Sequence, residues 1–246
     1  MTTRTSATIG RVARLDRLSA LQDAAKWLAI AAMVLDHVGR VLAPEVEGLR
    51  VVGRIAWPLF ALLVGVNLGA RGVPAVRYLP RLAVWAVPAQ IAFALHGWRD
   101  LNILVTLALG VVLWGVLRGE LRWPWALLLV LAPAVEYGPA GVLLVPVCAA
   151  LSVRGGLWWG SAALTLTLLS QGSFYWAAQT YLQLVAVGVS VWAAFALLGQ
   201  RRSWHASIPD LLGYVPRVPR WFSYAFYPAH LLLLAALSAV APAVPA

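Results

Sequence analysis

Nine apolar runs follow one another along the 246-residue chain, separated by short breaks that contain polar residues, glycine or proline. A helix of about 20 apolar residues crosses a bilayer. Lipid satisfies no backbone polar group, so only helices or closed barrels can span it. The pattern predicts an all-α integral membrane protein, a polytopic bundle of about nine transmembrane helices. The runs lie at roughly 24–42, 51–70, 79–97, 101–117, 122–135, 140–153, 156–172, 175–198 and 222–241.

The composition supports this class. Hydrophobic residues make up 62% of the chain and charged residues only 11%, which is far from an ordinary soluble domain. No stretch is long enough to fold as a separate soluble unit, so residues 24–241 are predicted to form a single transmembrane helical domain. Residues 1–23 are polar and rich in arginine. We interpret them as a cytoplasmic basic segment, either a short helix on the membrane surface or a disordered tail.

The basic residues indicate the orientation. With nine spans and a cytoplasmic N-terminus, 15 of the 19 Lys and Arg residues fall on the inner side, and only Arg40, Arg50, Arg54 and Arg99 fall outside. This positive-inside bias predicts a multi-pass protein of the cell (plasma) membrane. Anionic lipid head groups are the expected partners of the inner arginines, so the net charge of +10 requires no nucleic acid.

Asp36 and His37 are adjacent ionisable residues inside the first apolar run. A charge at mid-helix costs about 2.5–3.5 kcal/mol on insertion scales and usually faces a bundle interior. At about 1.5 Å rise per residue, Arg54 lies at a similar depth on the next helix, which predicts an Asp36–Arg54 ion pair. Arg40, four residues after Asp36, is the competing partner. Neighbouring helix residues point about 100° apart, so His37 is predicted to face a separate cavity.

Four further polar or aromatic residues are candidates for substrate binding, namely Asn102, Glu136, Tyr227 and His230. Asn102 and Glu136 stand near predicted helix ends, where helix caps are common. His230 follows Pro228, which can open the backbone of a membrane helix. For these residues a structural role and a site role both remain open.

The chain contains no pattern typical of a metal or nucleotide site. HxxxH and HExxH spacings, Walker loops and dinucleotide glycine loops do not occur, so no metal is expected. Cys148 is the single cysteine, which excludes an intramolecular disulfide. His96 is interpreted as structural and His205 as a solvated loop residue. Gly65 and Gly69 form a GxxxG pattern that indicates close helix packing.

Taken together, several segments resemble the TraX family of membrane proteins, which is named for the acetylation of conjugative pilin. The resemblance covers most of the chain, from Leu21 to Leu234. One departure is Glu136, where the family pattern leads us to expect aspartate. The matching pieces are Ala25-Lys26-Trp27-Leu28, Leu35-Asp36-His37-Val38-Gly39, Arg50-Val51-Val52-Gly53-Arg54 with the following Ile55-Ala56-Trp57-Pro58-Leu59-Phe60, Leu101-Asn102-Ile103-Leu104-Val105-Thr106-Leu107, Glu136-Tyr137-Gly138, and Tyr224-Ala225-Phe226-Tyr227-Pro228-Ala229-His230.

The resemblance implies an acyltransferase that takes acetyl groups from acetyl-CoA, in which a histidine of an early helix is essential. His37 matches that histidine, and its near-neutral pKa as a free side chain suits a general base. Asp36 and Arg54 complete the candidate catalytic set. The acceptor would be an amine or hydroxyl on a pilin-like peptide, a glycan or a small molecule.

Acetyl-CoA would enter from the cytoplasm, where Arg77, Arg81 and Arg118 are candidates to hold its phosphates. Three other classes remain open. A proton-coupled transporter could use Asp36, His37 and Arg54. A haem protein could use His37 and His230 as axial ligands. A structural scaffold would need neither chemistry.

Overall fold

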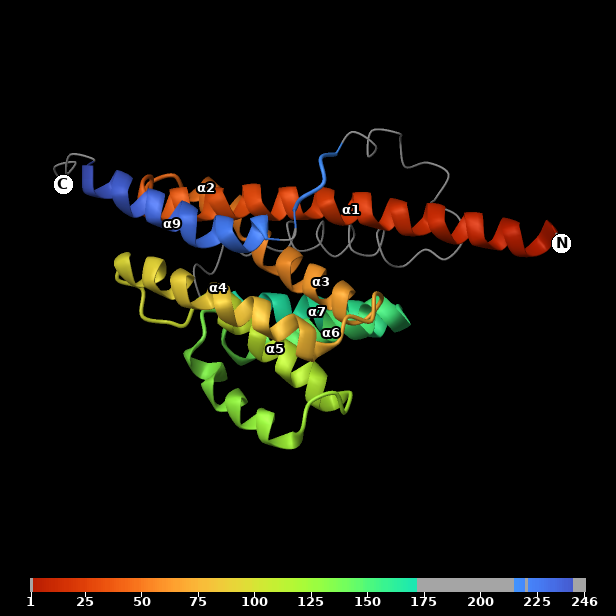
Figure 1. Cartoon of the computed structure of the whole chain (residues 1–246). Helices are drawn as coiled ribbons and strands as arrows, with labels where there is room; N and C mark the ends of the chain where they lie inside the picture. Colours follow the sequence, from red (N-terminus) through yellow and green to blue (C-terminus); the bar gives the residue numbers. More distant parts are fainter. Residues whose placement is uncertain (1, 172–214, 220, 241–246) are drawn as a thin grey trace.

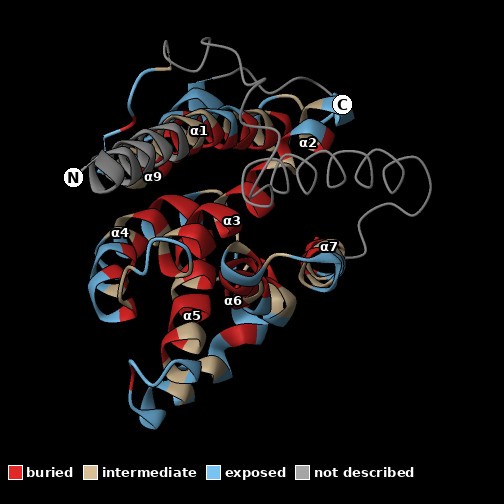
Figure 2. Cartoon of the chain, turned by 90° about the vertical axis from the view of Figure 1, so that its right-hand side faces the viewer, coloured by how far each residue is buried: buried red, intermediate tan, exposed pale blue. Residues whose placement is uncertain are grey.

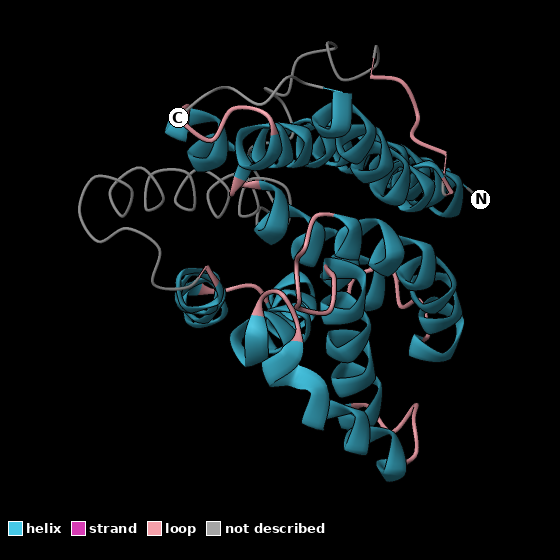
Figure 3. Cartoon of the chain, turned by 90° about the vertical axis from the view of Figure 1, so that its left-hand side faces the viewer, coloured by secondary structure: helices cyan, strands magenta, loops and turns pink. Residues whose placement is uncertain are grey.

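The computed structural model describes residues 2–171, 215–219 and 221–240, with side chains from Ser19 onward. Within these ranges the protein is helical, and the only strand-like feature is one bridge between Leu101 and Val135 (Figure 3). The elements are α1 (Thr2–Val41), α2 (Glu47–Gly53), α3 (Ala56–Leu68), α4 (Ala75–Leu95), α5 (Ile103–Leu117), the 3-10 helix η1 (Trp123–Ala134), α6 (Gly138–Arg154), α7 (Leu157–Ser170) and α9 (Phe222–Val240).

The all-α prediction is confirmed, and the described residues form eight α-helices rather than nine. The predicted run at 175–198 lies outside the described residues, as do His205 and the nearby arginines. The run at 51–70 is divided, because the backbone turns at Arg54 and Ile55 between α2 and α3. The run at 122–135 forms a 3-10 helix with Pro124 in its first turn and Pro133 near its end.

Three segments are long and apolar enough to cross a membrane, namely Glu47–Leu68, Ala75–Leu95 and Phe222–Val240. Helices α5, α6 and α7 and the 3-10 helix η1 are apolar but shorter. Along α4, Val84, Val87, Ile91 and Leu95 form an exposed apolar ridge. Because these positions recur at helical spacing, they present one continuous apolar face, as expected where a helix meets lipid. The fold is that of a helical membrane protein.

The buried core lies where α3, α5 and α6 meet (Figure 2). Trp57 of α3 is almost fully buried, stacks on Tyr137 at 4.1 Å between ring centroids and donates a hydrogen bond to Ser170. Gly65 of α3 leaves no room for a β-carbon against Cys148 and Ala149 of α6, and Gly69, which caps α3, leaves none against Ala149 and Ser152. The predicted close helix packing of the GxxxG pattern is therefore confirmed.

Helix α1 is one continuous helix (Figure 1). It runs without a break across the predicted boundary between the basic segment, residues 1–23, and the transmembrane domain, which begins at residue 24. Helix α9 runs beside its second half in the same direction, since Trp27 contacts Phe222 and His37 contacts His230. Helix α2 runs back along α1, with Gly39 against Arg50 and Asp36 against Gly53. Asp36 and His37 therefore lie between α2 on one side and α9 on the other.

Candidate functional site

The predicted ion pair between Asp36 and Arg54 is confirmed. Arg54 Nε lies 3.6 Å from Asp36 Oδ1, and both side chains are largely buried, with 17% and 10% of their surfaces exposed. Arg54 occupies this place because it ends α2, at the same depth as Asp36 in the α1–α2 hairpin. Arg40, the competing partner, instead lies 3.9 Å from Glu136. The bundle therefore holds two ion pairs, and within each pair the opposite charges neutralise each other.

His37 and His230 form a buried hydrogen-bonded pair. His37 Nδ1 lies 2.8 Å from His230 Nε2, and His230 Nδ1 lies 3.0 Å from the carbonyl oxygen of Phe226. A carbonyl only accepts, so His230 Nδ1 must carry a proton. In neutral His230 the Nε2 atom then accepts, and His37 Nδ1 donates to it. This chain of donors leaves His37 Nε2 with its lone pair, and no hydrogen bond among the described residues uses that atom.

Trp98 packs against the His37 ring of this pair. Trp98 stacks on His37 at 5.6 Å and on His96 at 4.7 Å between ring centroids, and the guanidinium of Arg40 lies 3.8 Å from the Trp98 ring. His96 Nε2 lies 3.0 Å from the carbonyl oxygen of Leu231, which ties α4 to α9. These contacts give His96 the structural role expected of it and hold the plane of the His37 ring.

A small chamber of about 10 Å³ lies next to His37. That volume suits one water-sized group. The sequence predicted that Asp36 and His37 face separate spaces. This prediction is wrong, because both residues line the chamber. The buried Tyr227 hydroxyl has no hydrogen-bond partner of good geometry in the described part of the chain, although the backbone of Ile103 is close by. The lining residues are Met33, Asp36, His37, Gly53, Ala56, Ile103, Glu136, Tyr137 and Tyr227.

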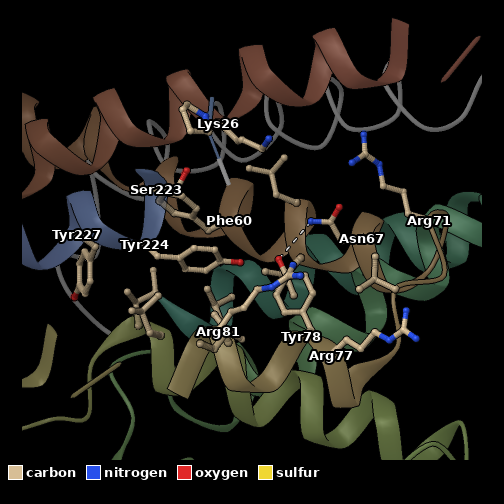
Figure 4. A pocket seen from close by; sticks show the side chains of 18 of the residues that line it. Lys26, Phe60, Asn67, Arg71, Arg77, Tyr78, Arg81, Ser223, Tyr224 and Tyr227 are labelled. Atoms are coloured by element: carbon tan, nitrogen blue, oxygen red, sulfur yellow. Dashed lines mark hydrogen bonds between the residues drawn. The ribbon is translucent and has the colours of Figure 1, made fainter. Parts of the chain in front are cut away.

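A larger cavity of about 470 Å³ shares part of its lining with the chamber. Figure 4 shows side chains that line this cavity. This volume is within the range of about 300–1,000 Å³ typical of small-molecule sites. Four cationic side chains line it, those of Lys26, Arg71, Arg77 and Arg81. Lys26 is paired with Asp23 at 2.7 Å, whereas Arg77 and Arg81 have no carboxylate partner among the described residues. The cavity therefore has a positively charged wall suited to an anion such as phosphate.

Three residues, Met33, Ile103 and Tyr227, line both the cavity and the chamber. They come from α1, α5 and α9, so the three helices meet at the boundary between the two spaces. The cavity thus extends from the arginines of α4 towards the histidine pair. We call Met33, Ile103 and Tyr227 together the throat.

The side chain of Asn102 forms hydrogen bonds with residues of α4 and α5. Its side-chain oxygen caps α5 by accepting from the Leu104 amide at 2.9 Å. Its side-chain nitrogen donates to the carbonyl of Ala86 at 3.0 Å and to the side chain of Gln90 at 2.8 Å. Asn102 is fully buried and lines neither the cavity nor the chamber. It connects α4 to α5.

Four of the five other predicted residues line the chamber, the cavity or both. Tyr227 and Glu136 line the chamber, and Arg77 and Arg81 line the cavity. Arg118 does not line the cavity; its guanidinium lies over Trp114 at the end of α5. Sequence reasoning missed Met33, Ile103 and Trp98 as site residues. It also left Lys26 and Arg71 out of the candidate cofactor site, although both line the cavity together with Arg77.

The described residues hold no group of three or more His, Cys, Asp or Glu side chains that could bind a metal ion. The direct contact of His37 with His230 also argues against a haem held between them. Two histidines that share one metal need about 4 Å between their nitrogens, taking a metal–nitrogen bond of about 2 Å. The observed distance is 2.8 Å.

The fold and the site define a class: a helical membrane protein with a paired histidine beside a cavity that carries positive charge. The chain belongs to the TraX family, whose model, described as "TraX protein", matches residues 21–238. Relatives include two proteins named "Protein TraX" from Escherichia coli, one of them from strain K12, each 34% identical over 134 residues. These matches cover 51% of this chain and 54% of each relative, so the chain spans about half the length of these relatives.

A protein of Rickettsia prowazekii (strain Madrid E) that is named only as uncharacterized is 35% identical over 89 residues, which is 36% of this chain and 34% of that protein. No solved structure matches the chain.

Proposed function

We propose that the protein is an integral membrane acetyltransferase that moves an acetyl group from acetyl-CoA to an amine or hydroxyl acceptor at or beyond the membrane. The observation that carries the proposal is the His37–His230 pair at 2.8 Å, next to a cavity whose other walls carry Lys26, Arg71 and two arginines of α4. Transfer from a long, phosphorylated acyl donor requires a base at one end of the binding site and anion-binding groups at the other end.

The donor binds with its phosphates against Arg71, Arg77 and Arg81. Arginine forms paired hydrogen bonds with phosphate oxygens, which a lysine cannot do. The narrow pantetheine arm then lies in the cavity, and the thioester reaches the throat. By the positive-inside bias of the sequence, these arginines face the cytoplasm, where acetyl-CoA is present.

His37 Nε2 acts as the general base. It takes the proton from the acceptor nitrogen or oxygen as that atom attacks the thioester carbonyl carbon. The tetrahedral intermediate then collapses, the carbon–sulfur bond breaks, and the sulfur leaves with the proton that His37 holds. The products are the acetylated acceptor and CoA with a free thiol, so atoms and charge balance. His230 keeps the proton of His37 on Nδ1 and orients the ring.

The remaining chamber residues have supporting roles. The Tyr227 hydroxyl lines both spaces and is available as a donor to the developing oxyanion. The Asp36–Arg54 pair fixes the depth of α1 against α2, and Arg40 pairs with Glu136. Because the charges are paired, the chamber holds no net charge that would exclude a neutral thioester.

The acceptor is proposed by class only, as an amine or hydroxyl on a pilin-like peptide, a glycan or a small molecule. The site lies near the end of α1 that the topology places on the outer side, which suits an acceptor that approaches from outside the cytoplasm. Membrane lipids surround the bundle, and no metal and no nucleic acid take part in the proposed reaction.

The test uses purified full-length protein in liposomes, supplied with radiolabelled acetyl-CoA and an extract of membrane and envelope material. We expect label transfer or acetyl-CoA hydrolysis by the wild type, and a loss of about 10²–10⁴-fold in His37→Gln, the range that a general base contributes. His96→Gln is the matched control, because His96 also stacks on Trp98 but lies outside the chamber. Equal rates in wild type and His37→Gln would remove His37 from the reaction.

The same liposomes test the transporter alternative. A proton-coupled transporter would show a pH change across the liposome membrane that His37→Gln abolishes, together with no binding of acetyl-CoA. That pair of results would replace the acetyltransferase proposal.

A further inference from the structure

The throat is built from one aromatic and two aliphatic side chains that are almost completely buried. Met33 is 4% exposed, Ile103 is 7% exposed and Tyr227 is 2% exposed. They stand between a space of about 470 Å³ and one of about 10 Å³. The change in size across a single layer of side chains is abrupt. These three residues are the ones that the two spaces share, so in the proposed function the acyl group passes them on its way to His37.

The chamber beyond the throat limits what can follow. Its volume suits one water-sized group, about the size of a methyl group. Gly53 and Ala56 belong to its wall and have little or no side chain to move aside. The rest of the wall includes Asp36 and Glu136, which an alkyl chain would separate from their charged partners at a cost.

The larger cavity offers no alternative place for an acyl tail. In the proposed function that space holds the pantetheine arm of the donor. The acyl group is attached at the end of that arm, so it is the first part to arrive at the throat. Carbon atoms added to the acyl group therefore need space at the throat or beyond it.

We propose that Met33 and Ile103 restrict the acyl donor to the two-carbon group, which makes them the residues that determine acyl-chain length. The inference rests on the proposed acetyl transfer. Ile103 is branched at its β-carbon and has restricted rotation, so it forms a fixed side of the throat. Met33 is unbranched and fills the remaining gap. Shortening either side chain opens the path for longer acyl groups.

The experiment measures acyl transfer or hydrolysis with acetyl-, propionyl-, butyryl- and hexanoyl-CoA, for the full chain in liposomes. In the wild type we expect a loss of about 10–200-fold for each added methylene group, the range seen for one methylene in a close-fitting pocket. In Met33→Ala and in Ile103→Val we expect the butyryl-to-acetyl rate ratio to rise, by about tenfold or more for Met33→Ala. The ratio is independent of how much of the variant folds, because both rates come from one preparation.

Leu63→Ala is the matched control. Leu63 is buried and lines the larger cavity but not the chamber. Its truncation enlarges the cavity away from the throat, so the rate ratio should stay at the wild-type value. A rise equal to that of Met33→Ala would overturn the assignment of the throat.

The two proposals fail in different ways. Wild-type protein that uses acetyl-CoA and butyryl-CoA equally well, or throat variants with unchanged ratios, overturns the chain-length inference while the acyltransferase activity stands. Protein that neither binds nor consumes any of the four acyl-CoA compounds overturns the proposed function, and the chain-length inference with it.

Discussion

Gly53 lies directly against the backbone of Asp36, so closely that a β-carbon at position 53 would overlap the main chain of α1. Only glycine can lie this close to the backbone of α1, because every other residue has a β-carbon. The close approach brings the end of α2 onto α1 at the depth of the charged pair, and the next residue, Arg54, then reaches Asp36. The ion pair is therefore a consequence of helix packing at a residue without a side chain.

Gly53→Ala should destabilise the α1–α2 hairpin, because the added methyl group meets backbone atoms that cannot rotate away. Overpacking of this kind costs about 1–3 kcal/mol. Thermal unfolding of detergent-purified protein measures the change. Gly48→Ala is the control within the same helix, since nothing lies within 4 Å of a β-carbon there. Equal unfolding temperatures for the two variants would contradict the close packing of Gly53.

Asp36 and Arg54 should show strong coupling in a double-mutant cycle. Removing one partner leaves a buried charge unpaired, at a cost of about 3–5 kcal/mol, whereas removing both leaves none. We expect Asp36→Asn and Arg54→Gln each to lower stability more than the double variant does. Arg99→Ala provides the baseline, because exposed Arg99 should change stability by less than about 0.5 kcal/mol. Additive effects of the two single changes would mean that the pair carries no interaction energy.

How much of this site the sequence predicts depends on the distance along the chain. The Asp36–Arg54 pair follows from counting residues on either side of one short turn, with a fixed rise per residue. His37 and His230 are 193 residues apart, and helical periodicity does not say which helices are neighbours. Their direct contact could not be predicted for that reason.

The throat shows the same limit in a different way. In the sequence, Met33 and Ile103 are apolar residues within apolar runs, and nothing separates them from residues that face lipid. Asn102 was recognised as an unusual polar residue, but its contacts with α4 depend on how α4 and α5 pack. The 3-10 geometry of residues 123–134 was also missed, since propensity describes single residues and not a run of this kind.

His230→Phe should impair catalysis without preventing binding of the donor. The Phe ring keeps the stacking on Phe226 but cannot accept the proton of His37 Nδ1. His37 then loses the contact that leaves Nε2 free, and we expect the rate to fall by about a hundredfold, at the lower end of a general-base effect. His230→Gln should restore part of the rate, because its side-chain oxygen can accept that proton. The binding of acetyl-CoA, measured by equilibrium dialysis, should match that of the wild type.

A structural role for His230 would give a different result. Both variants would then lose donor binding and thermal stability together, and His230→Gln would be no better than His230→Phe.

Arg77→Ala and Arg81→Ala should weaken the binding of acetyl-CoA and leave the maximal rate nearly unchanged. A hydrogen bond to a charged group contributes about 1.5–3 kcal/mol, and exposure to solvent reduces this value, so we expect KM to rise by about tenfold. Arg118→Ala is the matched control, because Arg118 lies on the same predicted side of the membrane but outside the cavity. An equal rise in KM for Arg118→Ala would show that net positive charge, and not the cavity, binds the donor.

Asn102→Ala should reduce stability while the folded protein keeps its activity. The change removes a helix cap, worth about 0.5–2 kcal/mol, and the two hydrogen bonds that the side-chain nitrogen donates to Ala86 and Gln90, worth about 0.5–1.5 kcal/mol each. Because Asn102 lines neither the cavity nor the chamber, KM for acetyl-CoA and the rate per folded molecule should stay near the wild-type values. Thermal unfolding gives the first quantity, and activity divided by the amount of monodisperse protein gives the second. Asn102→Asp should retain the cap, since its carboxylate can still accept from the Leu104 amide. A large rise in KM with normal stability would instead return Asn102 to the substrate-binding residues that the sequence suggested.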